Sequence, residues 1–137
     1  MKTIFAIIFS LLFSQLVSAQ TQEDFLVLKE TGNYYLTKFD STLEYSVLNA
    51  SKIVVFNHTL PISKNIGREI NFFTVNEKAE KKTINTRIIG TTTYNGEEKY
   101  FVELTLSLKN EEKKVKLILA DLSTEERKLI AGKNWIK

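Results

Sequence analysis

The side chains that carry most enzyme chemistry are scarce in this chain of 137 residues, which has no cysteine and a single histidine, His58. Without cysteine, disulfides, iron–sulfur sites and zinc ribbons are excluded, and one histidine cannot supply a multi-histidine metal site. A Ser-His-Asp triad could use only His58, which has no nucleophile signature nearby and is better interpreted as a polar residue at a strand end. We therefore expect no metal and no cofactor, and this scarcity is compatible with acid–base chemistry by carboxylates.

Sequence motifs and overall charge exclude further classes of function. The chain contains no glycine-rich phosphate loop, no H-E-x-x-H and no G-x-S-x-G pattern. Its formal net charge of +3, from 19 Lys+Arg and 16 Asp+Glu, is too small to indicate a nucleic-acid partner. The length allows one domain and not two.

Residues 1–19 have the layout of a secretory signal peptide. A short start with one lysine precedes the apolar run Ile4–Val17, and Ser18 and Ala19 are the small residues that signal peptidase requires. The run is too short for a comfortable membrane span, and an uncleaved N-terminal anchor is the alternative. We predict cleavage after Ala19, a secreted or periplasmic location with no stable membrane anchor, and a mature domain over residues 20–137.

The mature chain has the pattern of a β protein. Apolar side chains alternate strictly with other residues from Tyr100 to Leu108, which is typical of a half-buried strand, and a second apolar row follows in the next segment. We predict a hairpin around Asn110–Lys113 that keeps both rows on one face, because a one-residue slip would turn one row over. The predicted pairs are Leu108 with Val115, Leu106 with Leu117, and Leu104 with Leu119.

A strong turn signal, Asn95-Gly96, precedes this hairpin and joins Ile84–Tyr94 to it. A two-residue turn would place Ile89 opposite Val102, whereas a three-residue loop would place Ile88 opposite Leu104. Gly90 is a candidate bulge within the segment.

Shorter strands are expected upstream, and one of them has a competing interpretation. After Asp40, the pattern Ser41-x-x-Glu44 fits a helix capping box, so the segment from Leu43 could be helical instead. The only proline lies in Leu60–Gly67, which is predicted to be a loop. The expected short strands are Phe25–Lys29, Tyr34–Phe39, Leu43–Leu48, Ile53–Phe56 and Ile70–Val75.

The C-terminal part reads differently from the strands before it. Asn76–Lys82 is predicted to be a charged connector, and Ser123–Glu126 could form one helical turn or a loop. The short apolar run Lys128–Ala131 then stops at Gly132. Trp135 is expected to be a packing anchor.

Two distant segments together resemble a known family. The segment Leu36–Ala50 resembles the active-site segment of retropepsin-like aspartic peptidases, in which an apolar strand leads to D-[TS]-G-A and a second apolar strand. It is more specifically similar to the bacterial branch labelled ATP-dependent zinc proteases, whose segment reads K-x-D-T-G-A-x-T-S-x-L-x-A. Leu117–Asp121 followed by Leu129–Ile136 resembles that branch's closing pattern of a strand, a polar loop and L-[IL]-G-R-x-x-L. The resemblance spans roughly Tyr34 to Ile136.

This resemblance implies a mainly β fold, a single-lobe retropepsin-like closed β-barrel with a short C-terminal helix. It places Asp40 on the catalytic aspartate and Ser41 on the residue whose hydroxyl braces two active-site loops. Thr42 completes the active-site loop at a position where the family has glycine. Ala131 and Gly132 fall on the supporting second loop.

The same resemblance implies a homodimer acting on peptide or protein substrates. Peptide hydrolysis by an aspartic dyad needs one ionised carboxylate to activate water and one protonated carboxyl to polarise the scissile carbonyl. The chain contains one such segment, so each of two copies would contribute Asp40 across a two-fold axis. The residues give no support to the zinc or ATP of the branch's label.

Other functions remain open at this stage. Asp40-Ser41-Thr42 could be a plain turn between two strands, because Asp and Ser favour turns. The protein could be a catalytically inactive member of the same fold that binds peptide or an envelope component. It could also be an unrelated small secreted β-barrel that holds an apolar ligand in an internal cavity. The peptidase-like fold instead predicts Asp40 and Ser41 at a loop tip, with Ala131-Gly132 packed behind them.

Overall fold

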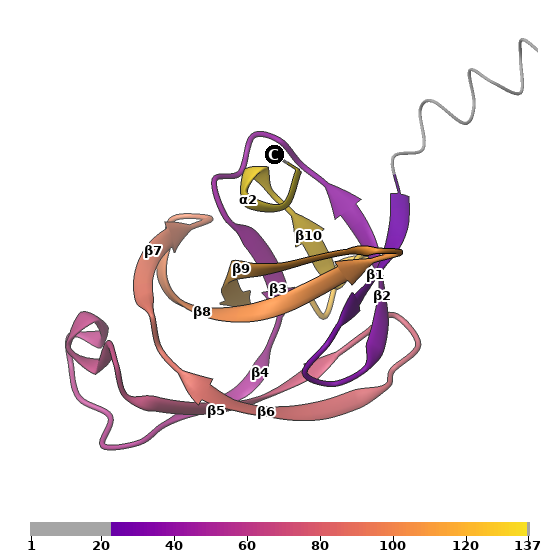
Figure 1. Ribbon diagram of the computed structural model, residues 1–137. Coiled ribbons are helices and arrows are strands. Elements are labelled where there is room, and N and C mark those ends of the chain that lie inside the picture. Colours follow the sequence, from indigo (N-terminus) through magenta and orange to yellow (C-terminus); the bar gives the residue numbers. More distant parts are fainter. Residues whose placement is uncertain (1–22, 137) are drawn as a thin grey trace, which may run out of the picture.

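The computed structural model describes residues 23–136, so the expected signal peptide (residues 1–19) lies outside the described residues. Strands dominate the described chain, and Figure 1 shows how they curve around one core. The strands are β1 (Glu23–Leu28), β2 (Asn33–Phe39), β3 (Ser46–Asn49), β4 (Ser51–Val55), β5 (Glu69–Val75), β6 (Lys81–Arg87), β7 (Gly90–Tyr94), β8 (Glu97–Leu108), β9 (Glu111–Ala120) and β10 (Leu129–Ala131). The helical elements are the 3-10 helix η1 (Ile62–Asn65) and the α-helix α2 (Lys133–Ile136).

The larger sheet closes on itself. Its strands follow the order β1-β2-β10-β3-β9-β8-β7, and β1 also pairs with β8 through Val27↔Ser107 and Leu28↔Leu106. β7 lies outside this closed ring, where it pairs antiparallel with β8. The expectation of a mainly β fold with a closed barrel, here of six strands, and a short C-terminal helix is confirmed.

Side chains fill the barrel interior. The predicted alternation on β8 is confirmed, since its apolar row points inward and the residues between point outward. The smaller sheet β4-β5-β6 adds Ile70, Phe72 and Ile84 to the same cluster and so covers one end of the barrel (Figure 1). The largest buried barrel side chains are Leu26, Leu28, Tyr35, Leu48, Leu106, Leu117, Leu119 and Leu129.

The predicted register of the β8–β9 hairpin is wrong by an even number of residues. The structure pairs Leu104 with Val115 and Val102 with Leu117, because the turn is the two residues Lys109 and Asn110. Lys109 takes a positive φ of 55°, which tightens the turn beyond what its residue type suggests. The shift is even, so the predicted faces survive although the pairs do not.

The segment predicted as one strand, Ile84–Tyr94, divides between the two sheets. Its first part belongs to β6 and pairs with β5, and its second part is β7. The two-residue turn at Asn95-Gly96 is confirmed, with Tyr94 opposite Glu97. Gly90 begins β7 under the ring of Phe101, where a Cβ would lie 2.5 Å from Cζ, so a close ring contact and not a bulge explains this glycine.

Other expectations for individual elements had mixed outcomes. The strand after Asp40 begins only at Ser46, and the competing helix does not form. Leu60–Gly67 contains η1, and β6 begins at Lys81, within the expected connector. Trp135 is buried, as expected of a packing anchor. Among the helices that the structure describes, none combines the length and apolarity needed to cross a membrane.

A buried hydrogen bond ties the barrel to the smaller sheet and can be tested. The hydroxyls of Tyr35 and Thr74 lie 2.7 Å apart and both residues are fully buried. Burial raises the pKa of Tyr35 to about 12. Tyr35→Phe leaves the Thr74 hydroxyl unsatisfied, so we expect a loss of about 1–3 kcal/mol in the free energy of unfolding, measured by denaturant titration.

A neighbouring tyrosine provides the control. Tyr34 is exposed, and Tyr34→Phe should leave the unfolding free energy unchanged. The double variant Tyr35→Phe/Thr74→Val should recover most of the loss, because neither polar partner remains. Equal stability of Tyr35→Phe and wild type would contradict this assignment.

Candidate functional site

The two segments singled out from the sequence meet around Asp40. Asp40 begins the loop between β2 and β3, and β10 lies between these two strands, parallel to β2 and antiparallel to β3. The backbone N–H of Asp40 donates to the carbonyl of Ala131 at 2.9 Å. On the other side of β10, the N–H of Lys133 donates to the carbonyl of Leu43 at 2.8 Å. The Asp40 loop is therefore held at its first residue and at Leu43 by the backbone of residues 131–133.

Gly132 packs directly against this loop. A Cβ at Gly132 would lie 2.6 Å from the carbonyl oxygen of Tyr45 and 2.8 Å from that of Leu43. These are backbone atoms that β3 and β10 fix in place, so they cannot move away as a side chain could. The close approach of the two loops depends on the absence of a side chain at this position.

A polar network that the sequence pattern does not indicate supports this contact. The Ser46 hydroxyl accepts a hydrogen bond from the N–H of Gly132 at 3.0 Å and donates to Asn134 Oδ1 at 2.7 Å. Asn134 Nδ2 in turn donates to the carbonyl of Lys116 on β9 at 2.8 Å. The network joins β3, α2 and β9 behind the loop. Its only sequence signal is a serine at the start of β3 and an asparagine two residues after Gly132.

The carboxylate of Asp40 interacts with its own loop. Oδ1 accepts hydrogen bonds from the Thr42 hydroxyl at 2.5 Å and from the Thr42 N–H at 3.0 Å. These two bonds, with the charge of Lys38 as a smaller contribution, hold the pKa of Asp40 below its usual value. Asp40 as a residue is partly buried, but its carboxylate makes these hydrogen bonds at the exposed surface, and with its lowered pKa it carries its charge at neutral pH.

The other predicted site residues have distinct positions. Ser41 and Thr42 are exposed beside Asp40, whereas Ala131 and Gly132 are buried behind the loop. This is the predicted arrangement of a loop tip with the second segment packed behind it. Lys133 is exposed at the start of α2.

An apolar cluster on the outer face of the barrel lies next to the Asp40 loop. Its buried members come from β3, β8, β9 and the loop after β9, and four half-buried side chains, Leu43, Tyr45, Tyr94 and Ile130, form its margin. Tyr94 is the last residue of β7, next to the Asn95-Gly96 turn of the β7–β8 hairpin. Burial, and then the negative charges of Glu125 and Asp40, raise the pKa of Tyr94. The tip of this hairpin therefore lies within electrostatic reach of Asp40. The buried members are Val47, Phe101, Ile118, Ala120 and Leu122.

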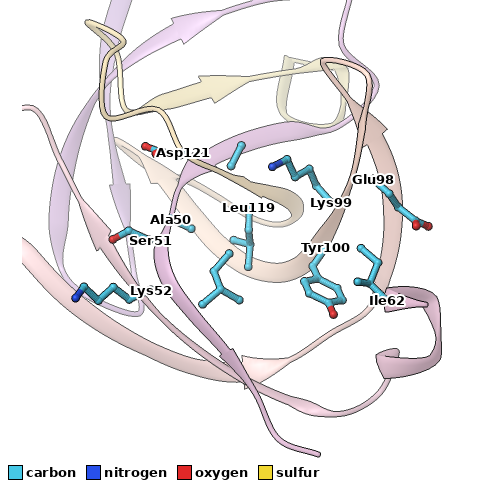
Figure 2. Close-up of a pocket in the computed structure, with 11 residues that line it drawn as sticks. Ala50, Ser51, Lys52, Ile62, Glu98, Lys99, Tyr100, Leu119 and Asp121 are labelled. Atoms are coloured by element: carbon cyan, nitrogen blue, oxygen red, sulfur yellow. The ribbon is translucent and has the colours of Figure 1, made fainter. Parts of the chain in front are cut away.

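A separate pocket of about 430 Å³ opens on the side of the barrel, between the start of β4, η1, the start of β8 and the end of β9. Figure 2 shows apolar and charged side chains around it. Among the described strands, β4 pairs only with β5, so its other edge is free beside this pocket. Asp40 is not among the residues that line the pocket. The labelled side chains include Ile62, Tyr100 and Leu119, and the charged Lys52, Glu98, Lys99 and Asp121.

The part of the chain that the structure describes offers no set of side chains that could bind a metal ion. Within residues 23–136, no group of three or more His, Cys, Asp or Glu side chains is arranged to hold a metal ion.

Comparisons with known proteins support the fold but identify no family or activity. No protein-family model matches the chain, and no curated protein matches it. The structure is similar to the crystal structure of a protein of unknown function (DUF785) from Legionella pneumophila subsp. pneumophila str. Philadelphia 1. The TM-score is 0.69 and the sequence identity 16%, over 83% of this chain and 82% of that chain. At that identity the likeness shows a shared fold and assigns no activity.

The contact at Gly132 gives a stability prediction. Gly132→Ala places a methyl group against two fixed carbonyl oxygens, so we expect a loss of about 1–3 kcal/mol in the free energy of unfolding. Glu44→Ala, an exposed change in the facing loop, should shift it by less than about 0.5 kcal/mol. Denaturant titration compares the two, and a Gly132→Ala variant as stable as wild type would contradict the close approach.

The Thr42–Asp40 contact gives a pKa prediction. Thr42→Val removes the hydroxyl donor and keeps the backbone N–H, so the pKa of Asp40 should rise toward its ordinary value, and Thr42→Ser should keep it low. Because the folded-state pKa is lowered, ionised Asp40 stabilises the fold above the unfolded-state pKa. That contribution is lost as the pH falls through the folded-state pKa. Carboxyl NMR titration measures the shift, and identical pKa values in Thr42→Val and wild type would exclude the hydroxyl as its cause.

Proposed function

We propose that this protein is an exported retropepsin-like aspartic peptidase that hydrolyses peptide bonds as a homodimer, with Asp40 from each subunit forming the catalytic dyad. The observation that carries the proposal is the position of β10, which passes between β2 and β3 and fixes Asp40 at the start of the connecting loop. A plain turn between two strands would not need a third strand inserted behind it, nor a glycine in contact with its backbone.

The proposed chemistry explains why one chain is insufficient. Two carboxylates brought together across a two-fold axis cannot both ionise, so they share one proton and titrate as a pair. The ionised Asp40 takes a proton from a bound water, whose oxygen attacks the scissile carbonyl carbon. The protonated Asp40 of the other subunit gives its proton to the carbonyl oxygen, which forms a neutral gem-diol intermediate. The first Asp40 then gives the proton it took from water to the amide nitrogen. The C–N bond breaks, the amine leaves, and one hydroxyl of the gem-diol returns a proton to the other Asp40, so that the carboxylic acid product forms and the dyad is restored.

The β7–β8 hairpin is the element best placed to cover a substrate. Its turn, Asn95-Gly96, is next to Tyr94, which lies within electrostatic reach of Asp40 and packs on the cluster beside the loop. A hairpin over the site would exclude water during the reaction. A second surface loop, Leu60–Gly67, has no described contact with the Asp40 loop and is less suited to this role.

A second function, peptide binding without turnover, is favoured by two observations. Thr42 occupies the glycine position of the family's motif, and its hydroxyl engages the carboxylate oxygen that would serve as base. The pocket beside the free edge of β4 offers backbone groups to which an extended peptide could add as a strand. An apolar ligand inside the barrel has the least support, because core side chains fill the interior.

A cleavage assay separates these functions. The mature protein should hydrolyse an unfolded protein substrate at acidic pH, where a shared proton is present on the dyad, and a statine-type inhibitor should block it. Asp40→Asn should abolish cleavage, because an amide can neither accept the proton of water nor share one. Equal cleavage by Asp40→Asn and wild type would refute the catalytic claim.

The Thr42→Gly variant gives the sharper comparison. If the Thr42 hydroxyl only lowers the pKa of Asp40, Thr42→Gly should raise the rate and move the pH optimum upward. If neither wild type nor Thr42→Gly cleaves, while both retain peptide binding, the non-catalytic function holds.

A further inference from the structure

Exposed apolar side chains gather at one end of the molecule, around η1. Leu60 is 71% exposed, Phe56 66%, and Ile66 48%. Ile89, 44% exposed, belongs to the same end, because the N–H of Gly67 donates to the carbonyl of its neighbour Ile88 at 2.8 Å. Figure 1 shows the η1 loop projecting from the side of the structure, apart from α2. Large apolar side chains held in water at a projecting loop indicate a contact surface.

The loop that carries these side chains is held in place from inside. Asn65 is fully buried, and its side chain bonds to both the N–H and the carbonyl of Thr59 at 3.0 Å. Its amide also donates to the Tyr100 hydroxyl at 2.7 Å, and its oxygen accepts from Arg68 Nη1 at 3.1 Å. The apolar residues are therefore presented by a fixed loop, and little ordering entropy would be lost on contact.

The charges at this end are mostly positive. No Asp or Glu occurs between Glu44 and Glu69, a stretch that includes Lys52, Lys64 and Arg68. Arg87 joins this end by donating to the carbonyl of Gly67 at 3.0 Å. Two carboxylates lie near it: Glu69, 3.7 Å from Arg87, and Glu98, which lines the same pocket as Ile62 of η1. The three cations Lys64, Arg68 and Arg87 still outnumber them.

We propose that this basic–apolar end, defined by Phe56, Leu60, Ile66 and Ile89 with Lys64, Arg68 and Arg87, docks on the surface of an anionic lipid bilayer. Apolar tips flanked by Lys and Arg are the composition that inserts into the headgroup region while its cations contact acidic lipids. A bilayer fits better than a protein partner because the surface projects, and a stable protein interface buries about 1,200 Å² or more across a matched face. The inference does not depend on the proposed peptidase activity.

Vesicle co-sedimentation tests the proposal. The protein is used from Gln20, because the described fold lies wholly within residues 23–136 and the apolar run Ile4–Val17 would bind lipid by itself. It should bind vesicles of phosphatidylglycerol and phosphatidylcholine in equal parts more tightly than pure phosphatidylcholine vesicles, and salt should weaken the binding. Lys64→Gln should weaken it about fivefold.

The apolar contribution has its own variants and a matched control. Phe56→Ser/Leu60→Ser should weaken vesicle binding at least as strongly as Lys64→Gln, whereas Tyr34→Ser, at a 60% exposed residue on β2, should not change it. Circular dichroism should show that all variants keep the fold. The proposal would be overturned by equal binding to both kinds of vesicle, or by an equal loss of binding in the Tyr34→Ser control. It would also be overturned if the protein did not bind vesicles but self-associated with rising concentration, and Phe56→Ser/Leu60→Ser abolished that self-association.

Discussion

The arrangement around Asp40 depends on one strand of three residues, β10. It forms backbone hydrogen-bonded pairs with β2 on one side and β3 on the other, and it joins strands that the Asp40 loop alone would leave apart. Without β10 the barrel would be open between β2 and β3 and the loop would have no support. The whole arrangement requires a residue without a side chain at Gly132, because the two loops touch there.

This constraint determines where chemistry can occur. The backbone of the Asp40 loop is fixed from behind, while its carboxylate faces solvent beside an apolar cluster margin and the tip of the β7–β8 hairpin. The pKa of this carboxylate is lowered mainly by its two hydrogen bonds from Thr42, with a smaller contribution from Lys38, and no second carboxyl among residues 23–136 is hydrogen-bonded to it. The proposed peptidase therefore needs the second subunit for chemistry as well as for substrate binding. The lipid-docking end is built from other elements, and neither proposal supports the other.

The sequence predicted those features that local pattern controls. Alternation on β8 and the Asn95-Gly96 turn were sufficient to place faces and one register, because both act within a hairpin. The β8–β9 register was missed, since a lysine at positive φ makes a tight turn that residue preference does not indicate. The division of Ile84–Tyr94 between two sheets follows from packing of distant strands, which a local pattern does not encode. At the site, the two motifs located Asp40 and Gly132, but the link from Ser46 to Asn134 depends on side chains 88 positions apart.

The most direct test of the account is the distance between the two Asp40 loops in solution. The chain has no cysteine, so Glu44→Cys, an exposed substitution in the Asp40 loop, would accept one spin label per subunit. We predict a single short distance between the two labels of a dimer, measured by pulsed electron paramagnetic resonance. The dipolar signal should disappear when labelled protein is diluted with unlabelled protein. An equally labelled Ser123→Cys, in the exposed loop after β9, gives the reference distance for the same dimer. Monomeric protein, or a dimer whose Glu44 labels lie farther apart than its Ser123 labels, would contradict a shared Asp40 dyad.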